Sequence, residues 1–153
     1  MDAFQALLCD EVTYVVEEAS VRFGPTFHLT GAAQKEACLA LVTGSMPQYL
    51  TSLQKQLQAH GGQYFADKRL TVADLNAFVD VRALNSVWLD HVPAELVQTV
   101  APLQKAHLQR IAQDPAALAY CAKFAASQRG TGFTTVNLVP IGPVTVNADL
   151  LAC

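Results

Sequence analysis

Residues 61–75, GGQYFADKRLTVADL, hold the strongest signal for the fold of this chain. Two glycines end one helical region, a short loop follows, and Thr71-Val72-Ala73-Asp74 has the form of a capping box that opens the next helix. In such a box the Thr71 hydroxyl accepts from the Asp74 amide, and the Asp74 carboxylate accepts from the Thr71 amide. Leu70 and Leu75 take the positions of a hydrophobic staple. We therefore predict a structural role for these four residues, because this spacing at a helix start favours capping over a catalytic Thr–Asp pair.

The helix that begins at Thr71 is predicted to run to about residue 90. Its apolar residues point to most sides of a helix, whereas a helix at the rim of a core has one apolar stripe. We therefore expect it in the middle of the core, through Leu75, Phe78, Val79, Val81, Leu84, Val87 and Trp88.

Two helical regions precede this signal. Apolar residues at steps of three and four predict a helix over 2–23, with the stripe Phe4, Leu8, Val12, Val15, Ala19 and Phe23. A second region spans about 32–59, and Pro47 inside it predicts a kink or a break. Its stripe is Leu39, Val42, Met46, Tyr49 or Leu50, Leu53 and Leu57.

Two more helical regions follow. One covers about 94–112, with Pro102 expected to re-set it, and the other starts at Asp114-Pro115 and runs to about 127. From residue 129 the chain is rich in glycine, proline and β-branched residues, which favours extended structure. We thus predict an all-α bundle of about five helices over 1–128, and an extended apolar tail over 129–153 that forms a possible interaction arm.

The composition predicts that part of the folded surface is covered. Hydrophobic residues make up 52% of the chain and charged residues 15%, against roughly 25% charged in an ordinary soluble domain. No basic stripe with aromatics indicates a nucleic-acid surface, and no run of apolar residues is long enough for a membrane span. The acidic start does not resemble a secretory signal. We expect a protein that is not secreted, and that is cytoplasmic or organellar after loss of a transit peptide.

The sequence offers no metal site, no cofactor site and no catalytic set. Cys9, Cys38, Cys121 and Cys153 lack paired spacing, so we expect them to pack as small hydrophobic residues. His28, His60, His91 and His107 lack the spacing of a helical metal pair and are predicted at the surface or at helix ends. An activated phenol at Tyr14, Tyr49 or Tyr64 would need a partner that the sequence does not show.

Several stretches in order resemble the C-terminal, all-helical domain of cytosolic glutathione transferases, nearest its sigma-like branch. They are MPQYLTSLQKQL at 46–57, the segment 61–75, and PLQKAHLQRIAQDPAALAY at 102–120. The resemblance is closest over 46–124. It implies that the helix at 2–23 matches the one that lines the dimer groove and part of the hydrophobic substrate pocket. The family's catalytic and glutathione-binding residues belong to an N-terminal thioredoxin-like domain that has no counterpart in this sequence.

Two functions follow as expectations. The first is a non-catalytic structural or protein-interaction subunit that docks into a larger assembly or oligomer through the helix 2–23 and the tail 129–153. The second is the helical half of a glutathione S-transferase whose thioredoxin-like half is on another chain or has been removed, so that glutathione binds only if that half is supplied. A weaker third option is a carrier for a small apolar ligand.

Overall fold

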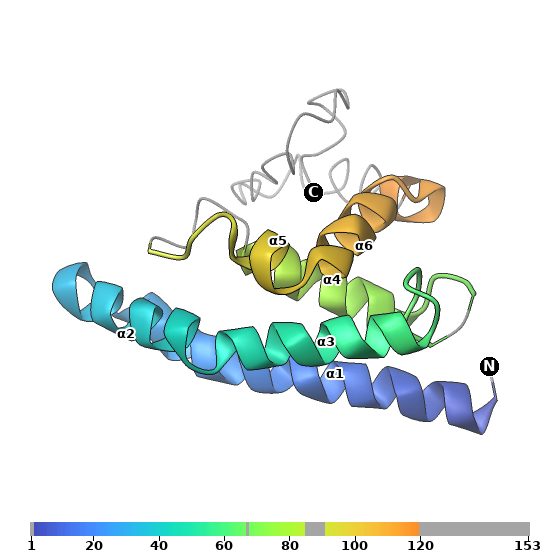
Figure 1. Ribbon diagram of the computed structural model, residues 1–153, viewed down its shortest axis with the longest axis horizontal. Coiled ribbons are helices and arrows are strands. Elements are labelled where there is room, and N and C mark those ends of the chain that lie inside the picture. The colour runs from blue at the N-terminus through green and yellow to red at the C-terminus, as the bar shows by residue number, and fades with distance from the viewer. Residues whose placement is uncertain (1, 67, 85–90, 120–153) are drawn as a thin grey trace, which may run out of the picture. The chain divides into compact units, whose positions relative to one another are not determined.

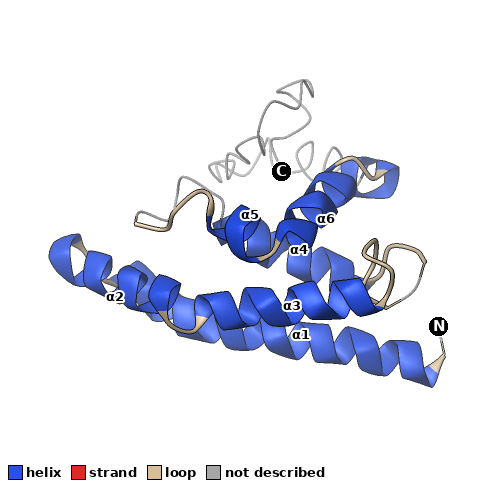
Figure 2. Ribbon diagram, viewed as in Figure 1, coloured by secondary structure: helices blue, strands red, loops and turns tan. Residues whose placement is uncertain are grey.

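The computed structural model describes residues 2–66, 68–84 and 91–119, and every regular element in these ranges is a helix (Figures 1 and 2). This confirms the predicted all-α class. The chain divides into two units, one ending at Leu108 and one beginning at Gln109. The elements are α1 (Ala3–Phe23), the short 3-10 helix η1 (Gly24–His28), α2 (Gly31–Thr43), α3 (Met46–Ala59), α4 (Val72–Leu84), α5 (Leu96–Val100) and α6 (Pro102–Ala112).

Helix α1 begins at a capping box that the sequence analysis did not identify. The Asp2 carboxylate accepts from the Gln5 amide at 2.8 Å, and the Gln5 side chain accepts from the Asp2 amide at 3.0 Å. The helix ends at Phe23, as predicted, and Gly24-Pro25 starts η1. Its buried residues are Cys9, Val12, Ala19 and Phe23. The assignment of Phe4 to the buried stripe was wrong, because this ring is 64% exposed in the first turn.

Helices α2 and α3 are separate, with Gly44-Ser45 between them and Pro47 in the first turn of α3. This confirms the predicted break, since proline is tolerated at the start of a helix, where its missing N–H costs nothing. Helix α3 buries the predicted stripe of Met46, Leu50, Leu53 and Leu57. Leu39 of α2, however, is 42% exposed, which corrects its assignment to the core. The α3 helix packs lengthwise along α1 (Figure 1).

Helix α4 packs against α1, and its buried residues lie on one side of the helix. That face is buried through Ala73, Asp74, Ala77, Val81 and Leu84. Its other side holds Val72 and Val79, which are 55% and 66% exposed. The expectation of a helix buried on most sides was therefore wrong for 72–84, and residues 85–90 lie outside the described residues. The apolar composition of this segment did not show that no other described helix packs on its second side.

Pro102 separates α5 from α6, which confirms the predicted re-set. In the second unit, the Asp114 carboxylate accepts from the Ala116 and Ala117 amides at 2.8 and 3.2 Å, and residues 115–119 are helical. This is the predicted Asp-Pro helix start. The remainder of that helix and the predicted tail at 129–153 lie outside the described residues.

Candidate functional site

The sequence pair Thr71–Asp74 forms the centre of a buried polar cluster, here called the Asp74 network (Phe65, Thr71, Asp74 and His107). One carboxylate oxygen of Asp74, Oδ2, accepts from the Thr71 backbone N at 2.8 Å and from the Thr71 hydroxyl at 2.6 Å. The other, Oδ1, accepts from the Phe65 backbone N at 3.0 Å and lies 3.0 Å from Nε2 of His107. The network therefore ties together the loop before α4, the first turn of α4, and α6.

His107 corrects the sequence analysis, which predicted all four histidines at the surface or at helix ends. Its side chain is fully buried, and its ring packs edge-on against Phe65 with the ring centres 5.2 Å apart. Because an ionised carboxylate can only accept, the proton of the hydrogen bond sits on Nε2 of His107. The predictions for His28, His60 and His91 are confirmed, since all three are exposed.

The hydrogen bonds decide the charge of Asp74. Burial by itself would raise the pKa of this carboxyl, but hydrogen bonds from His107, from the Thr71 hydroxyl and amide, and from the Phe65 amide together lower the pKa below its ordinary value. Asp74 is therefore ionised at neutral pH, even though its side chain has no exposed surface. A buried carboxylate of this kind is stable only while its donors stay in place.

The order of the groups argues for a structural role of the network. In a nucleophilic hydroxyl–imidazole–carboxylate site, the imidazole lies between the other two groups and takes the hydroxyl proton. Here the carboxylate lies in the middle, and the Thr71 hydroxyl donates to Asp74 instead of to His107. All three side chains are also buried, so a substrate has no access to them. Leu70 is half-buried and Leu75 is 40% exposed, and their staple contact stays a prediction.

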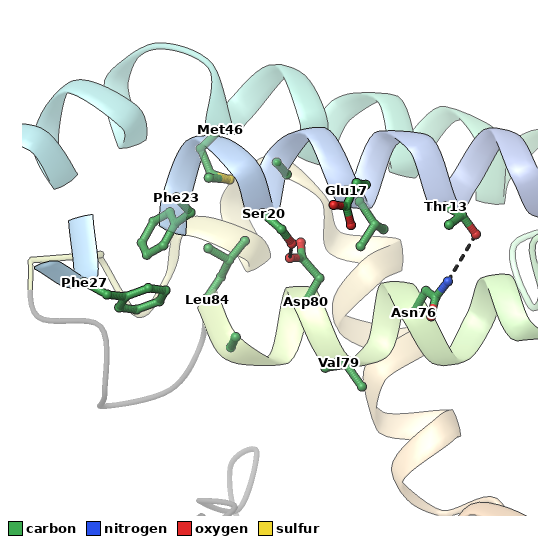
Figure 3. Close-up of a pocket in the computed structure, with 13 residues that line it drawn as sticks. Thr13, Glu17, Ser20, Phe23, Phe27, Met46, Asn76, Val79, Asp80 and Leu84 are labelled. Carbon is green, nitrogen blue, oxygen red and sulfur yellow. Dashed lines mark hydrogen bonds between the residues drawn. The ribbon is translucent and has the colours of Figure 1, made fainter. Parts of the chain in front are cut away.

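A second site is a pocket of about 410 Å³ between α1 and α4, here called the α1–α4 pocket (Figure 3). Two hydrogen bonds cross between the helices at the pocket: Ser20 donates to Asp80 at 2.8 Å, and Asn76 donates to Thr13 at 3.1 Å. Its apolar lining residues are Val16, Ala19, Phe23, Phe27, Met46, Val79, Ala83 and Leu84. The sequence analysis identified neither polar pair, because both depend on the register between two helices about sixty residues apart.

A family model described as "Glutathione S-transferase, C-terminal domain" matches residues 23–124, about two thirds of the chain. The chain belongs to this family. A search of the curated proteins found no match, and a search of the solved structures found none either. The Asp74 network lies wholly inside the matched residues, whereas nearly all of α1 precedes them.

This glutathione S-transferase C-terminal domain exposes an apolar row on α1, here called the outer face of α1 (Phe4, Leu7, Tyr14 and Val21). Steps of three and seven residues bring these side chains to one side of the helix. Each is more than 60% exposed. None of them lines the α1–α4 pocket, so the helix presents two distinct surfaces.

Over the described ranges, no helix of this domain is long and apolar enough to cross a membrane. The same ranges hold no group of three or more His, Cys, Asp or Glu side chains that could bind a metal ion. Cys9 and Cys38 are buried free thiols, as expected for small hydrophobic residues. Cys121 and Cys153 lie outside the described residues.

Proposed function

We propose that this glutathione S-transferase C-terminal domain is a non-catalytic protein-interaction module that docks into a larger assembly through the outer face of α1. The observation that carries the proposal is the row of four large side chains on one side of α1, all more than 60% exposed. Single exposed hydrophobic residues are ordinary in soluble proteins, but four large ones on the same side of one helix point to an interaction surface.

The helix is held firmly enough to present such a face. Its opposite side is buried through Cys9, Val12, Ala19 and Phe23, and its first turn is closed by the Asp2–Gln5 box. Tyr14 and Phe4 also belong to the aromatic residues that supply much of the contact area at protein interfaces. The low charge of the whole chain, 15%, agrees with a surface that is partly covered in the assembled state.

The alternative function is the helical half of a glutathione S-transferase, with a glutathione-binding half supplied by another polypeptide. The α1–α4 pocket favours it, because an apolar pocket between two helices would serve as one wall of a substrate site. Capture of the chain on immobilised glutathione, only in the presence of a partner with a thioredoxin-like domain, would support this alternative. In that case transferase activity should appear with the captured complex.

The docking proposal is tested by the size of the particle that contains the chain. We expect the tagged chain, expressed in its source cells, to occur in a particle well above its own 16.4 kDa by native mass spectrometry. The double variant Leu7→Gln with Tyr14→Ser should shift it to the monomer mass. Leu39→Gln is the matched control, because Leu39 is an exposed leucine on another helix. A monodisperse monomer for the unaltered chain would overturn the proposal.

A further inference from the structure

The α1–α4 pocket brings one mostly buried and one exposed acidic side chain next to apolar residues. Asp80 of α4 and Glu17 of α1 both line it, together with the apolar side chains of both helices (Figure 3). None of the described lining residues is a lysine, arginine or histidine. The electrostatic character of the pocket is therefore negative.

The buried charge of Asp80 is less well compensated by hydrogen bonds than that of Asp74. Asp80 is mostly buried, and burial raises the pKa of its carboxyl, which the hydrogen bond from Ser20 only partly offsets. This contrasts with Asp74, whose four hydrogen bonds lower the pKa. A buried carboxylate that accepts only one hydrogen bond has lost most of the stabilisation that water gives to its charge. A cationic group in contact with it would stabilise the ionised form again.

We propose that the α1–α4 pocket docks a segment of a partner protein that brings one lysine or arginine side chain to Asp80 and Glu17, flanked by apolar side chains. The proposal does not depend on the outer face of α1, which is a separate surface. Arginine suits the site best, because its planar guanidinium can contact two carboxylates.

The rim of the pocket points to a protein segment as the occupant. Val79 and Phe27 line the pocket and are still 66% and 58% exposed, so apolar surface continues outward from the cavity. A small cation would fill the acidic part and leave these side chains in water. A peptide segment would cover them, and the removal of this apolar surface from water would favour binding.

The test selects random dodecapeptides, displayed on phage, for binding to the immobilised full chain. Soluble Asp80→Asn variant is added during the selection, so that peptides that do not depend on Asp80 are removed. We expect the enriched peptides to carry a lysine or arginine next to aliphatic or aromatic residues. A synthetic copy of the best peptide should bind Asp80→Asn roughly tenfold or more weakly than the unaltered chain in a calorimetric titration. Its binding should also weaken with added salt.

Three controls keep the outcome interpretable. Glu17→Gln changes an exposed residue of the pocket and should weaken binding without any risk to folding. Asp10→Asn makes the same charge change on an exposed residue of α1 outside the pocket, and should leave affinity unchanged. Leu7→Gln with Tyr14→Ser should leave it unchanged too, which separates this inference from the docking proposal. Enriched peptides without a basic residue, equal affinity for Asp80→Asn, or no enrichment at all would each overturn the inference.

Discussion

At Asp74, four donors from three segments of the chain meet on one carboxylate. We expect Asp74→Ala to lower the free energy of unfolding by about 3–5 kcal/mol, because the buried donors of Phe65, Thr71 and His107 lose their acceptor. Urea denaturation followed by circular dichroism measures this loss. Asp10→Ala, at an exposed position of α1, should change the same quantity by no more than about 0.5 kcal/mol. A loss below about 1 kcal/mol for Asp74→Ala would contradict the role assigned to the network.

The same carboxylate makes stability depend on pH in the acidic range. Its pKa in the folded protein lies below the ordinary 3.8, so the unfolded chain takes up the proton first as the pH falls. The contribution of Asp74 is therefore complete well above pH 3.8. It is lost as the pH falls from that value through the lower pKa of the folded state. Denaturation curves between neutral pH and pH 3 should show less acid-induced loss in Asp74→Ala than in the unaltered chain. Equal acid sensitivity of the two proteins would contradict this expectation.

At the scale of single helices, α1 depends on its first turn. Asp2→Ala removes the side-chain acceptor of the Gln5 amide, which should cost about 1 kcal/mol. Hydrogen exchange at the Gln5 and Ala6 amides should speed up, while amides near the buried Ala19 keep their protection. Asp2→Asn retains a good cap and should behave like the unaltered chain. Fast exchange at Gln5 before any substitution would show that this turn is frayed in solution.

The helices themselves could be predicted from sequence, whereas their burial could be predicted only in part. Proline and glycine signals act locally, so the breaks at Gly44-Ser45 and at Pro102 are where the sequence analysis placed them. Burial depends on neighbours far along the chain. Val79 was expected in the core because it is apolar, and it is exposed because the described helices cover only the opposite side of α4.

The Asp74 network shows the same limit at the site. Thr71 and Asp74 were paired because they are three positions apart at a helix start, which is a local signal. The third side chain, His107, lies 33 residues farther along the chain than Asp74. A signal for its burial was present: His107, Leu108 and Ile111 follow the spacing of one helix face, and both apolar residues are buried. Its partner could not be inferred, because helical spacing does not say which helix lies opposite.

For the whole molecule, the predicted boundary at residue 128 gives a direct test of domain organisation. We expect residues 1–128 to fold without 129–153, because the five predicted helices and their apolar stripes all lie before that boundary. Circular dichroism and a cooperative thermal transition of the truncated chain check this. The free energy of unfolding should stay within about 1 kcal/mol of that of the full chain. A truncated chain without a cooperative transition would show that the tail is part of the folding unit.

The way Asp74 joins near and distant segments also has a kinetic consequence. Its bonds to Thr71 span three residues, so they can form as soon as α4 nucleates, whereas the bond to His107 must wait until a loop of 33 residues has closed. The transition state for folding should therefore contain the capped start of α4 without docked α6. His107→Phe should then mainly accelerate unfolding, with a φ-value near zero, while Thr71→Ala slows folding. The Asp74 carboxylate would thus act at two stages of folding. Its bonds to Thr71 help to form the folding nucleus, and its bond to His107 slows unfolding of the native state.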